Sequence, residues 1–366
     1  MIGHMVVQNV THRPMRTMIT VIGVAVEVTL VILVVGLTSG LLQDYAKRTE
    51  GVGADVMVRP PNSGYFLSLG GAPMPIAIGA KLQELQYVQA VAPVLVGFNS
   101  VSGLENIFGI EPESFRAVSG GFTFYSGHDL KDPDDILVDD IYAQGKKVKV
   151  GQTLHVLNHD FHVAGIVEHG KSARLFVTLA TLQEMMGAHD KASVFFVKCD
   201  RASHAAAVQD ETKQLLPGYE VQLPKELMAL MTSSNVPFLG TFINVMIGIA
   251  VIVGFLVTFL SMYTTVIERT REVGVLKALG ASKGYIVQVI VSETTLLCLL
   301  GLVFGIGLSF LTRSIAHKIW PSLPILITAG WIGRAGIIAI LGGVFGATYP
   351  AWLASRKDPV EALAYE

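Results

Sequence analysis

Charged residues are scarce in this chain of 366 residues. They make up 15% of the sequence, while 51% of the residues are hydrophobic; a typical soluble domain carries about 25% charged residues. No charged residue occurs from Leu227 to Ile267, and Glu293 is the only one between Lys283 and Arg313. This shortage excludes an ordinary soluble globular protein and indicates a membrane protein.

Cysteine is nearly absent as well. The chain has only Cys199 and Cys298, and Cys298 lies within a long apolar run. Two cysteines placed in this way exclude a disulfide-stabilised scaffold. The sequence also offers no constellation of a nucleophile with a nearby base, so we do not expect an enzyme.

Four apolar segments are long enough to cross a bilayer, which takes about 20 residues. They are residues 18–42, 238–266, 285–312 and 335–353. The first is too long for the apolar core of a signal peptide, so we expect it to stay as an anchor. Residues 1–17 have the apolar spacing of a short amphipathic helix lying on the inner membrane surface.

The loop charges predict the orientation of these spans. Four spans place both termini on one side, and Arg and Lys gather there in residues 13–16, 268–284 and the tail 354–366. The opposite loop, residues 313–334, is short. Because positive residues stay inside, we expect both termini and residues 268–284 in the cytoplasm, and the chain in a bacterial inner membrane.

Residues 43–235 then lie outside the cytoplasm. They hold 22 acidic and 16 basic residues, a balance that excludes a nucleic-acid surface. Eight short β-rich runs predict strands, at residues 54–58, 94–98, 106–110, 136–138, 153–157, 161–167, 175–179 and 194–197. Helical patterns lie between and after them, at residues 80–87, 139–144, 182–186 and 202–216. This mixture predicts a compact α+β domain. The expected fold is therefore a multi-pass α-helical membrane protein of four transmembrane helices, with a large extracytoplasmic α+β domain between spans 1 and 2.

One run in this domain matches a nucleotide-binding motif. Gly165–Ser172 fits the phosphate-loop pattern G-x-x-x-x-G-K-[ST]. A phosphate loop must open a helix whose N-terminal amides hold the phosphates. The residues after Ser172 predict a strand instead, and the domain faces away from cellular ATP. We therefore expect no nucleotide at Lys171.

Four histidines lie within fifteen residues of the same domain: His155, His159, His162 and His169. If residues 153–157 and 161–167 form a hairpin, His155 and His162 share a face at diagonal positions. Imidazole suits zinc or copper, but no cysteine or tight histidine pair supports a metal site. A polar, solvated hairpin face is the favoured interpretation, and we expect no metal.

Two carboxylates fall within predicted spans, Glu27 near the middle of the first and Glu293 in the third. An ionised carboxylate in hydrocarbon is costly, so each must face a protein interface or a polar cavity, or be protonated. Contact of Glu27 with a substrate headgroup or across a dimer is one alternative. A hydrogen bond between helices is the favoured one.

The segment from Glu268 to Ser282 joins the second and third spans and mixes charges with small apolar residues. Gly280 is well placed to end a helix there, and Ser282 to begin the next. Arg271–Ser282 reads REVGVLKALGAS. It matches, at every position, the R-E-[IV]-G-[IV]-L-[KR]-A-[LI]-G-A-[ST] run of the FtsX/MacB-like permeases. Tyr349–Ala351 and Asp358–Leu363 match their C-terminal pattern.

The chain therefore resembles the FtsX/MacB-like membrane subunits of ABC transporters, in their four-span branch. The resemblance implies a coupling segment that docks on two copies of a cytoplasmic ABC ATPase, and a second permease copy or paralogue. ATP and Mg would bind in the ATPase. This chain would bind no cofactor, and no L-S-G-G-Q run occurs in it. The expected coupling residues are Glu268, Arg269, Arg271, Glu272, Val273, Gly274, Leu276, Lys277, Ala278, Leu279, Gly280 and Ala281.

Two functions fit this resemblance. One is export or extraction of a substrate such as a drug, peptide, lipoprotein or lipid, driven by the separate ATPase. The other is a mechanotransmitting regulator that activates a cell-wall hydrolase or senses a peptide without transporting. A neighbouring gene for a periplasmic adaptor would favour export, and one for a hydrolase or sensor kinase would favour regulation.

Overall fold

The computed structural model describes residues 14–61, 63, 72–99, 105–226 and 237–356. The predicted surface helix at residues 1–17 lies largely outside them, and the Asp358–Leu363 run entirely so. The chain divides into two compact units. The helical unit holds described residues 14–40, 237–318 and 325–356, and the α/β unit holds those of 41–236 and 319–324.

Four long helices of the described chain are long and apolar enough to cross a membrane. They are α2 (Pro14–Glu50), α9 (Pro237–Glu268), α11 (Lys283–Ile319) and α12 (Ala329–Arg356). Each contains one predicted span and extends beyond it at both ends. At 1.5 Å per residue, the 37 residues of α2 measure about 55 Å, well beyond the ~30 Å of a bilayer core. The predicted multi-pass fold is confirmed.

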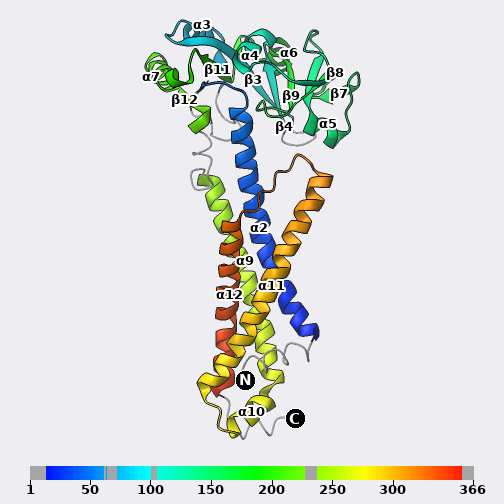
Figure 1. Ribbon diagram of the computed structural model, residues 1–366, viewed down its shortest axis with the longest axis vertical. Coiled ribbons are helices and arrows are strands. Elements are labelled where there is room, and N and C mark those ends of the chain that lie inside the picture. Colours follow the sequence, from blue (N-terminus) through cyan, green and yellow to red (C-terminus); the bar gives the residue numbers. More distant parts are fainter. Residues whose placement is uncertain (1–13, 62, 64–71, 100–104, 227–236, 357–366) are drawn as a thin grey trace. The chain divides into compact units, whose positions relative to one another are not determined.

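Small residues let the helices of the helical unit approach closely (Figure 1). A Cβ atom at Gly301 would lie 2.6 Å from Val24 Cβ, and one at Gly305 would lie 2.8 Å from Val28 Cβ. The backbones of α2 and α11 therefore meet through these two glycines, as small residues allow in membranes. On α12, Gly346 has the same role, because a Cβ there would lie 3.0 Å from Phe255 O of α9.

The α/β unit is built on a mixed sheet of ten strands in the order β12-β1-β11-β3-β4-β9-β6-β8-β5, with β7 paired to β8. The pairs β4–β9 and β6–β8 are parallel, and the others are antiparallel. A separate pair joins β2 and β10. The strands are β1 (Val56–Arg59), β2 (Met74–Pro75), β3 (Val88–Asn99), β4 (Glu105–Ile110), β5 (Phe124–Gly127), β6 (Asp135–Asp139), β7 (Thr153–Val156), β8 (His159–Val167), β9 (Leu175–Thr178), β10 (Lys191–Ala192), β11 (Val194–Cys199) and β12 (Glu220–Gln222).

Successive side chains of these strands point to opposite faces of the sheet and pack into a hydrophobic core on each face. Val94 and Phe108 pack on one face with α4, whereas Leu95 and Ile107 pack on the other with α5 and α6. The opposite-face core continues over β1 and β11 toward α3 and α7. The helices are α3 (Ala77–Gln83), α4 (Pro112–Ser119), α5 (Asp140–Lys146), α6 (Leu179–Met186) and α7 (Ala205–Leu215), with the 3-10 turn η1 (Ala202–His204).

The sequence predicted most of this domain but not all of it. Each of its eight predicted strands overlaps an observed one. The helix expected at residues 80–87 instead begins at Ala77 and ends at Gln83. Tyr87 lies outside it, in the turn before β3, with a left-handed φ of 70°. α4, β5, β12 and the β2–β10 pair were not predicted. They are short, and long-range packing rather than local periodicity defines them.

The last turns of α2 belong to the α/β unit. Leu42, Tyr45, Ala46 and Thr49 are buried there. Tyr45 and Thr49 line a small internal gap with Met57, Phe108 and Phe196 of the sheet. The helix that carries the first predicted span therefore ends inside the core of the domain.

Candidate functional site

The connection between α9 and α11 is a short helix, α10 (Thr270–Ala278), drawn at one end of the helical unit in Figure 1. It ends at Gly280, whose φ of +95° is a left-handed conformation that glycine adopts without strain. Ser282 Oγ then accepts a hydrogen bond from Tyr285 N at 3.2 Å, as an N-cap residue does at the start of a helix. The predicted helix break at Gly280 is confirmed.

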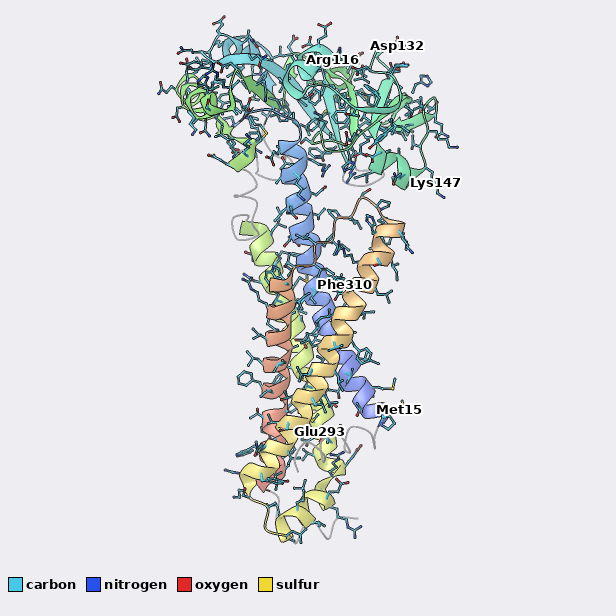
Figure 2. All side chains as sticks on the ribbon, in the orientation of Figure 1. Met15, Arg116, Asp132, Lys147, Glu293 and Phe310 are labelled. Carbon is cyan, nitrogen blue, oxygen red and sulfur yellow. The ribbon has the colours of Figure 1, made fainter. Side chains whose placement is uncertain are left out.

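One side of α10 is fixed to the membrane helices by two polar contacts. Arg269, next to its first residue, places Nη1 3.2 Å from Glu293 Oε2 on α11. Glu293 lies in the part of α11 nearer to α10, whereas Phe310 lies toward the other end (Figure 2). Lys277 Nζ donates a hydrogen bond of 3.1 Å to Ser355 O, in the last turn of α12. α10 is thereby held to both α11 and α12.

The other side of α10 is exposed. Five exposed residues of α10 and its C-cap follow the three- and four-residue spacing of one helix face: Arg271, Glu272, Val275, Ala278 and Leu279. Glu268, the last residue of α9, is also exposed.

We call the first five of these residues the outer face of α10. It carries two charges and, near its end, an apolar patch. Leu279 has 80% of its surface exposed and Val275 43%. The two side chains are neighbours on the helix surface, because they lie four residues apart.

The predicted coupling residues therefore divide into three sets by exposure. Glu268, Arg271, Glu272, Ala278, Leu279 and Gly280 are exposed, whereas Arg269 and Gly274 are buried. Val273, Leu276, Lys277 and Ala281 are half-buried, and Val273 packs against the core shared by α9, α11 and α12. Val275 was missing from the predicted set, although its helical spacing from Arg271 and Glu272 points to it.

Glu293 meets the expectation of a partner between helices, but Glu27 does not. The carboxyl of Glu27 lies against Gly254 of α9, in the space that a Cβ atom there would fill. Its Oε1 is buried and has no hydrogen-bond partner among the described residues. The hydrogen bond between helices that was expected at Glu27 is therefore absent at this atom.

The run that matches a phosphate loop has a different structural setting. Gly165 lies in β8, and the strand β9 begins at Leu175, three residues after Ser172, so the predicted strand is confirmed. Lys171 Nζ donates a 2.6 Å hydrogen bond to Ser119 O, at the end of α4. Burial lowers the pKa of the Lys171 ammonium below its ordinary value. No helix N-terminus follows that could hold phosphates.

This run instead contacts the end of α2. Arg48 Nη1 donates to Ser172 O at 3.4 Å. A Cβ at Gly51 would overlap Gly170 O, so the two backbones are in direct contact. Residues 170–172 hold the C-terminal end of α2 to the sheet, and we call this contact the α2 joint.

Of the clustered histidines, His155 and His159 lie within hydrogen-bond distance of carboxylates. β7 and β8 do form the predicted hairpin, and His155 pairs with Asp160, which places His162 diagonally from it. Nδ1 of His155 lies 2.7 Å from Asp160 Oδ1, and Nε2 of His159 lies 2.8 Å from Asp134 Oδ1. Among the described residues, no three His, Cys, Asp or Glu side chains come close enough to hold a metal.

Two protein-family models match the chain. The MacB-like periplasmic core domain matches residues 17–215, and the FtsX-like permease C-terminal model matches residues 244–359. Together they cover most of the α/β domain, most of the four long helices and all of α10.

Individual relatives match over nearly the whole chain. The macrolide export ATP-binding/permease protein MacB of Sodalis glossinidius is 25% identical over 400 residues, 99% of this chain but 60% of that protein. The uncharacterized ABC transporter permease YknZ of Bacillus subtilis is 24% identical over 99% of this chain and 98% of its own length.

Among solved structures, the periplasmic region of MacB from Actinobacillus actinomycetemcomitans is similar, with 18% identity and a TM-score of 0.39. It covers 50% of this chain and 94% of that one. The two family models together cover more than half of the chain. The periplasmic core model matches the first span and most of the domain that follows it, and the permease model matches most of the three later spans. The chain belongs to the FtsX/MacB-like family of ABC transporter permeases.

Proposed function

We propose that this permease couples ATP hydrolysis in a separate cytoplasmic ATPase to movement of its α/β domain, for export or extraction of a substrate. The observation that carries the proposal is the two-sided structure of α10. Its outer face is exposed, while Arg269 and Lys277 fix its inner side to α11 and α12. A displacement of α10 therefore acts on two spans at once.

The chemistry of the outer face suits a protein rather than lipid. Arg271 and Glu272 offer charges of both signs, and Val275 and Leu279 add apolar area beside them. Protein interfaces combine an apolar centre with charged residues that fix register. A lipid-facing segment would lack the charges, and a fully solvated loop would lack the apolar patch.

The remaining parts of the assembly follow from this proposal. ATP and Mg bind in the ATPase subunit, of which two copies serve a dimer of this chain or of this chain with a paralogue. The side of the membrane with α10 is the cytoplasm, and the membrane is a bacterial inner membrane. A drug, peptide, lipoprotein or lipid would be moved on the far side, with or without a periplasmic adaptor.

Charge reversal on α10 tests the docking. The variant R271E/E272R keeps the net charge but exchanges the positions of the positive and the negative charge that a partner would contact. We expect it, and separately L279E, to weaken co-purification of an ATPase subunit from membranes of the native host. Loss of about 2 kcal/mol at an interface hot spot lowers affinity about 30-fold. The ATPase is identified by mass spectrometry from its phosphate loop and L-S-G-G-Q run.

A matched control lies on α7 of the α/β unit. Asp210 and Lys213 are also exposed, oppositely charged and three residues apart on a helix. The reversed pair D210K/K213D should leave ATPase co-purification and membrane insertion unchanged. Recovery of the ATPase by R271E/E272R and L279E at the level of the control would refute docking at α10.

A further inference from the structure

Glu27 has an unusual environment for a carboxyl group. It lies near the middle of the apolar part of α2, and its side chain is 95% buried, since 5% of the residue's surface is exposed. The carboxyl lies in a slot made by the missing side chain of Gly254, where a Cβ atom would come within 2.7 Å of both carboxyl oxygens. The slot fits the group sterically but gives Oε1 no hydrogen-bond partner among the described residues.

The helices around this slot supply no counter-charge. On α9, the nearest polar side chain along the same face is Thr258, whose buried Oγ1 also lacks a partner in the described chain. On α11, the titratable group that interacts with Glu27 is the thiol of Cys298. On α12, Gly343 packs against Cys298 Sγ and brings no charge.

The charged groups elsewhere on these helices are engaged or distant. Arg269 pairs with Glu293, near α10. On α12, Arg334 and Arg356 lie over the rings of Trp331 and Trp352, close to its two ends. Asp44 and Arg48 pair with each other in the last turns of α2. No described basic side chain forms an ion pair with Glu27.

An unpaired carboxylate in hydrocarbon is costly, and a carboxylic acid is much less so. We propose that Glu27 is a proton-binding site inside the helical unit, whose neutral acid form seats α2 against α9 at Gly254. Release of the proton to water leaves a carboxylate that the slot cannot solvate. The charged form then favours separation of α2 from α9, so proton binding and helix contact are linked.

This site is independent of α10. It involves α2 and α9, and it would operate whether or not the outer face of α10 docks an ATPase. Thr20 Oγ1 and Ser261 Oγ, two turns away on the same two helices, form a hydrogen bond between them. Substitutions at Thr20 and Ser261 can therefore report on the contact between α2 and α9 without altering Glu27.

The first test reads the protonation state directly. We expect the infrared difference between wild type and E27Q, both full chains in phospholipid nanodiscs at neutral pH, to contain the C=O stretch of a carboxylic acid. The band should disappear at alkaline pH. The matched difference for E293Q should show carboxylate bands, because Glu293 is paired with Arg269. Carboxylate bands for Glu27 at neutral pH would overturn the proposal.

The second test reads the helix contact. T20C/S261C, in a chain whose native cysteines are replaced by alanine, forms a disulfide only when α2 and α9 are together. We compare its rate of disulfide formation with that of the same cysteine pair in an E27Q chain. We expect this ratio to fall as the pH is raised through the range in which the carboxylic-acid band of Glu27 disappears. The E27Q comparison cancels the pH dependence of thiolate chemistry. A ratio that stays constant would overturn the linkage.

E27Q also serves as a test in itself. Glutamine is a neutral isostere of the protonated acid, so the proposal requires that E27Q inserts and folds like wild type. Failure of E27Q to fold would show that Glu27 is needed as an anion, and would overturn the proposal.

Discussion

Arg269 Nη1 and Glu293 Oε2 lie 3.2 Å apart, and both side chains are at least nine-tenths buried. The residue just before α10 is thus paired with a carboxylate within the third predicted span. This pair explains how a charge can be kept in an apolar helix, since intramembrane carboxylates need a partner or a proton. It also joins the start of α10 to α11, so that the two cannot move separately without exposing a buried charge.

Removal of one partner of this pair should be far more harmful than removal of both. We expect R269M and E293L each to lower the stability of the protein in detergent by about 3 kcal/mol, because each leaves a buried charge unpaired. The double variant R269M/E293L should recover most of that loss. Unfolding of the four proteins is compared in a double-mutant cycle. Additive effects of the two single substitutions would contradict the pairing.

The glycines of α11 should differ in their tolerance of a methyl group according to what they face. We expect G301A and G305A each to destabilise the protein by about 2 kcal/mol, because the added Cβ would overlap Val24 or Val28 of α2 and overpacking is costly. G307A is the control on the same helix, since a Cβ there meets nothing within 4 Å. It should be neutral or slightly stabilising. Equal effects at all three positions would mean that α2 does not pack on this side of α11.

Lys171 should have a structural role and none in nucleotide chemistry. In the assembled complex, we expect K171A to keep full ATPase activity, because Gly165–Ser172 runs from one strand to the next and opens no helix. Loss of the hydrogen bond to Ser119 O should lower the stability of the α/β domain by about 1 kcal/mol. ATPase assays and thermal unfolding measure the two effects. Crosslinking of a nucleotide analogue to Lys171 in sealed, right-side-out vesicles would contradict this assignment.

The sequence was sufficient where a local pattern decides the structure. Long apolar runs predicted the four membrane helices, and Gly280 predicted the end of α10. The rotation of α10 about its axis was not predictable, because it depends on the distant partner Glu293. For the same reason Val273 and Leu276, two of the predicted coupling residues, turn partly inward. Likewise no local pattern predicts that the carbonyl of Gly36, in the first span, accepts a hydrogen bond from Leu326 N.

The strand order of the α/β domain is a second property that local sequence does not carry. β4 pairs in parallel with β9, which lies about 65 residues later in the chain. Such pairings are selected by burial on both faces of the sheet and not by the propensity of either strand. The α2 joint is likewise a long-range contact that local sequence does not predict. In the sequence, Lys171 and Ser172 match a phosphate loop, a function that their structure does not support. Only their contacts with Ser119 and Arg48 show that they connect α4 and the end of α2 to the sheet.

The continuity of α2 leads to a prediction about how motion reaches the α/β domain. The helix runs without a break from Pro14 to Glu50, and its last turns are buried in the domain and held by the α2 joint. A stiff helix transmits a tilt or a shift from one end to the other, whereas a flexible linker does not. We therefore expect α2 to be the element that carries displacement of the spans into the domain.

Insertions between Gly40 and Leu41 test this role. Four alanines lengthen the helix by about one turn and keep it continuous, whereas four glycines break it. In the complex with its ATPase, we expect hydrogen exchange in the α/β domain to differ between ATP-bound and nucleotide-free states in the wild type and the alanine variant. The glycine variant should lose most of that difference while ATPase co-purification stays unchanged. If the glycine variant kept the full difference, motion would reach the domain by a route other than α2.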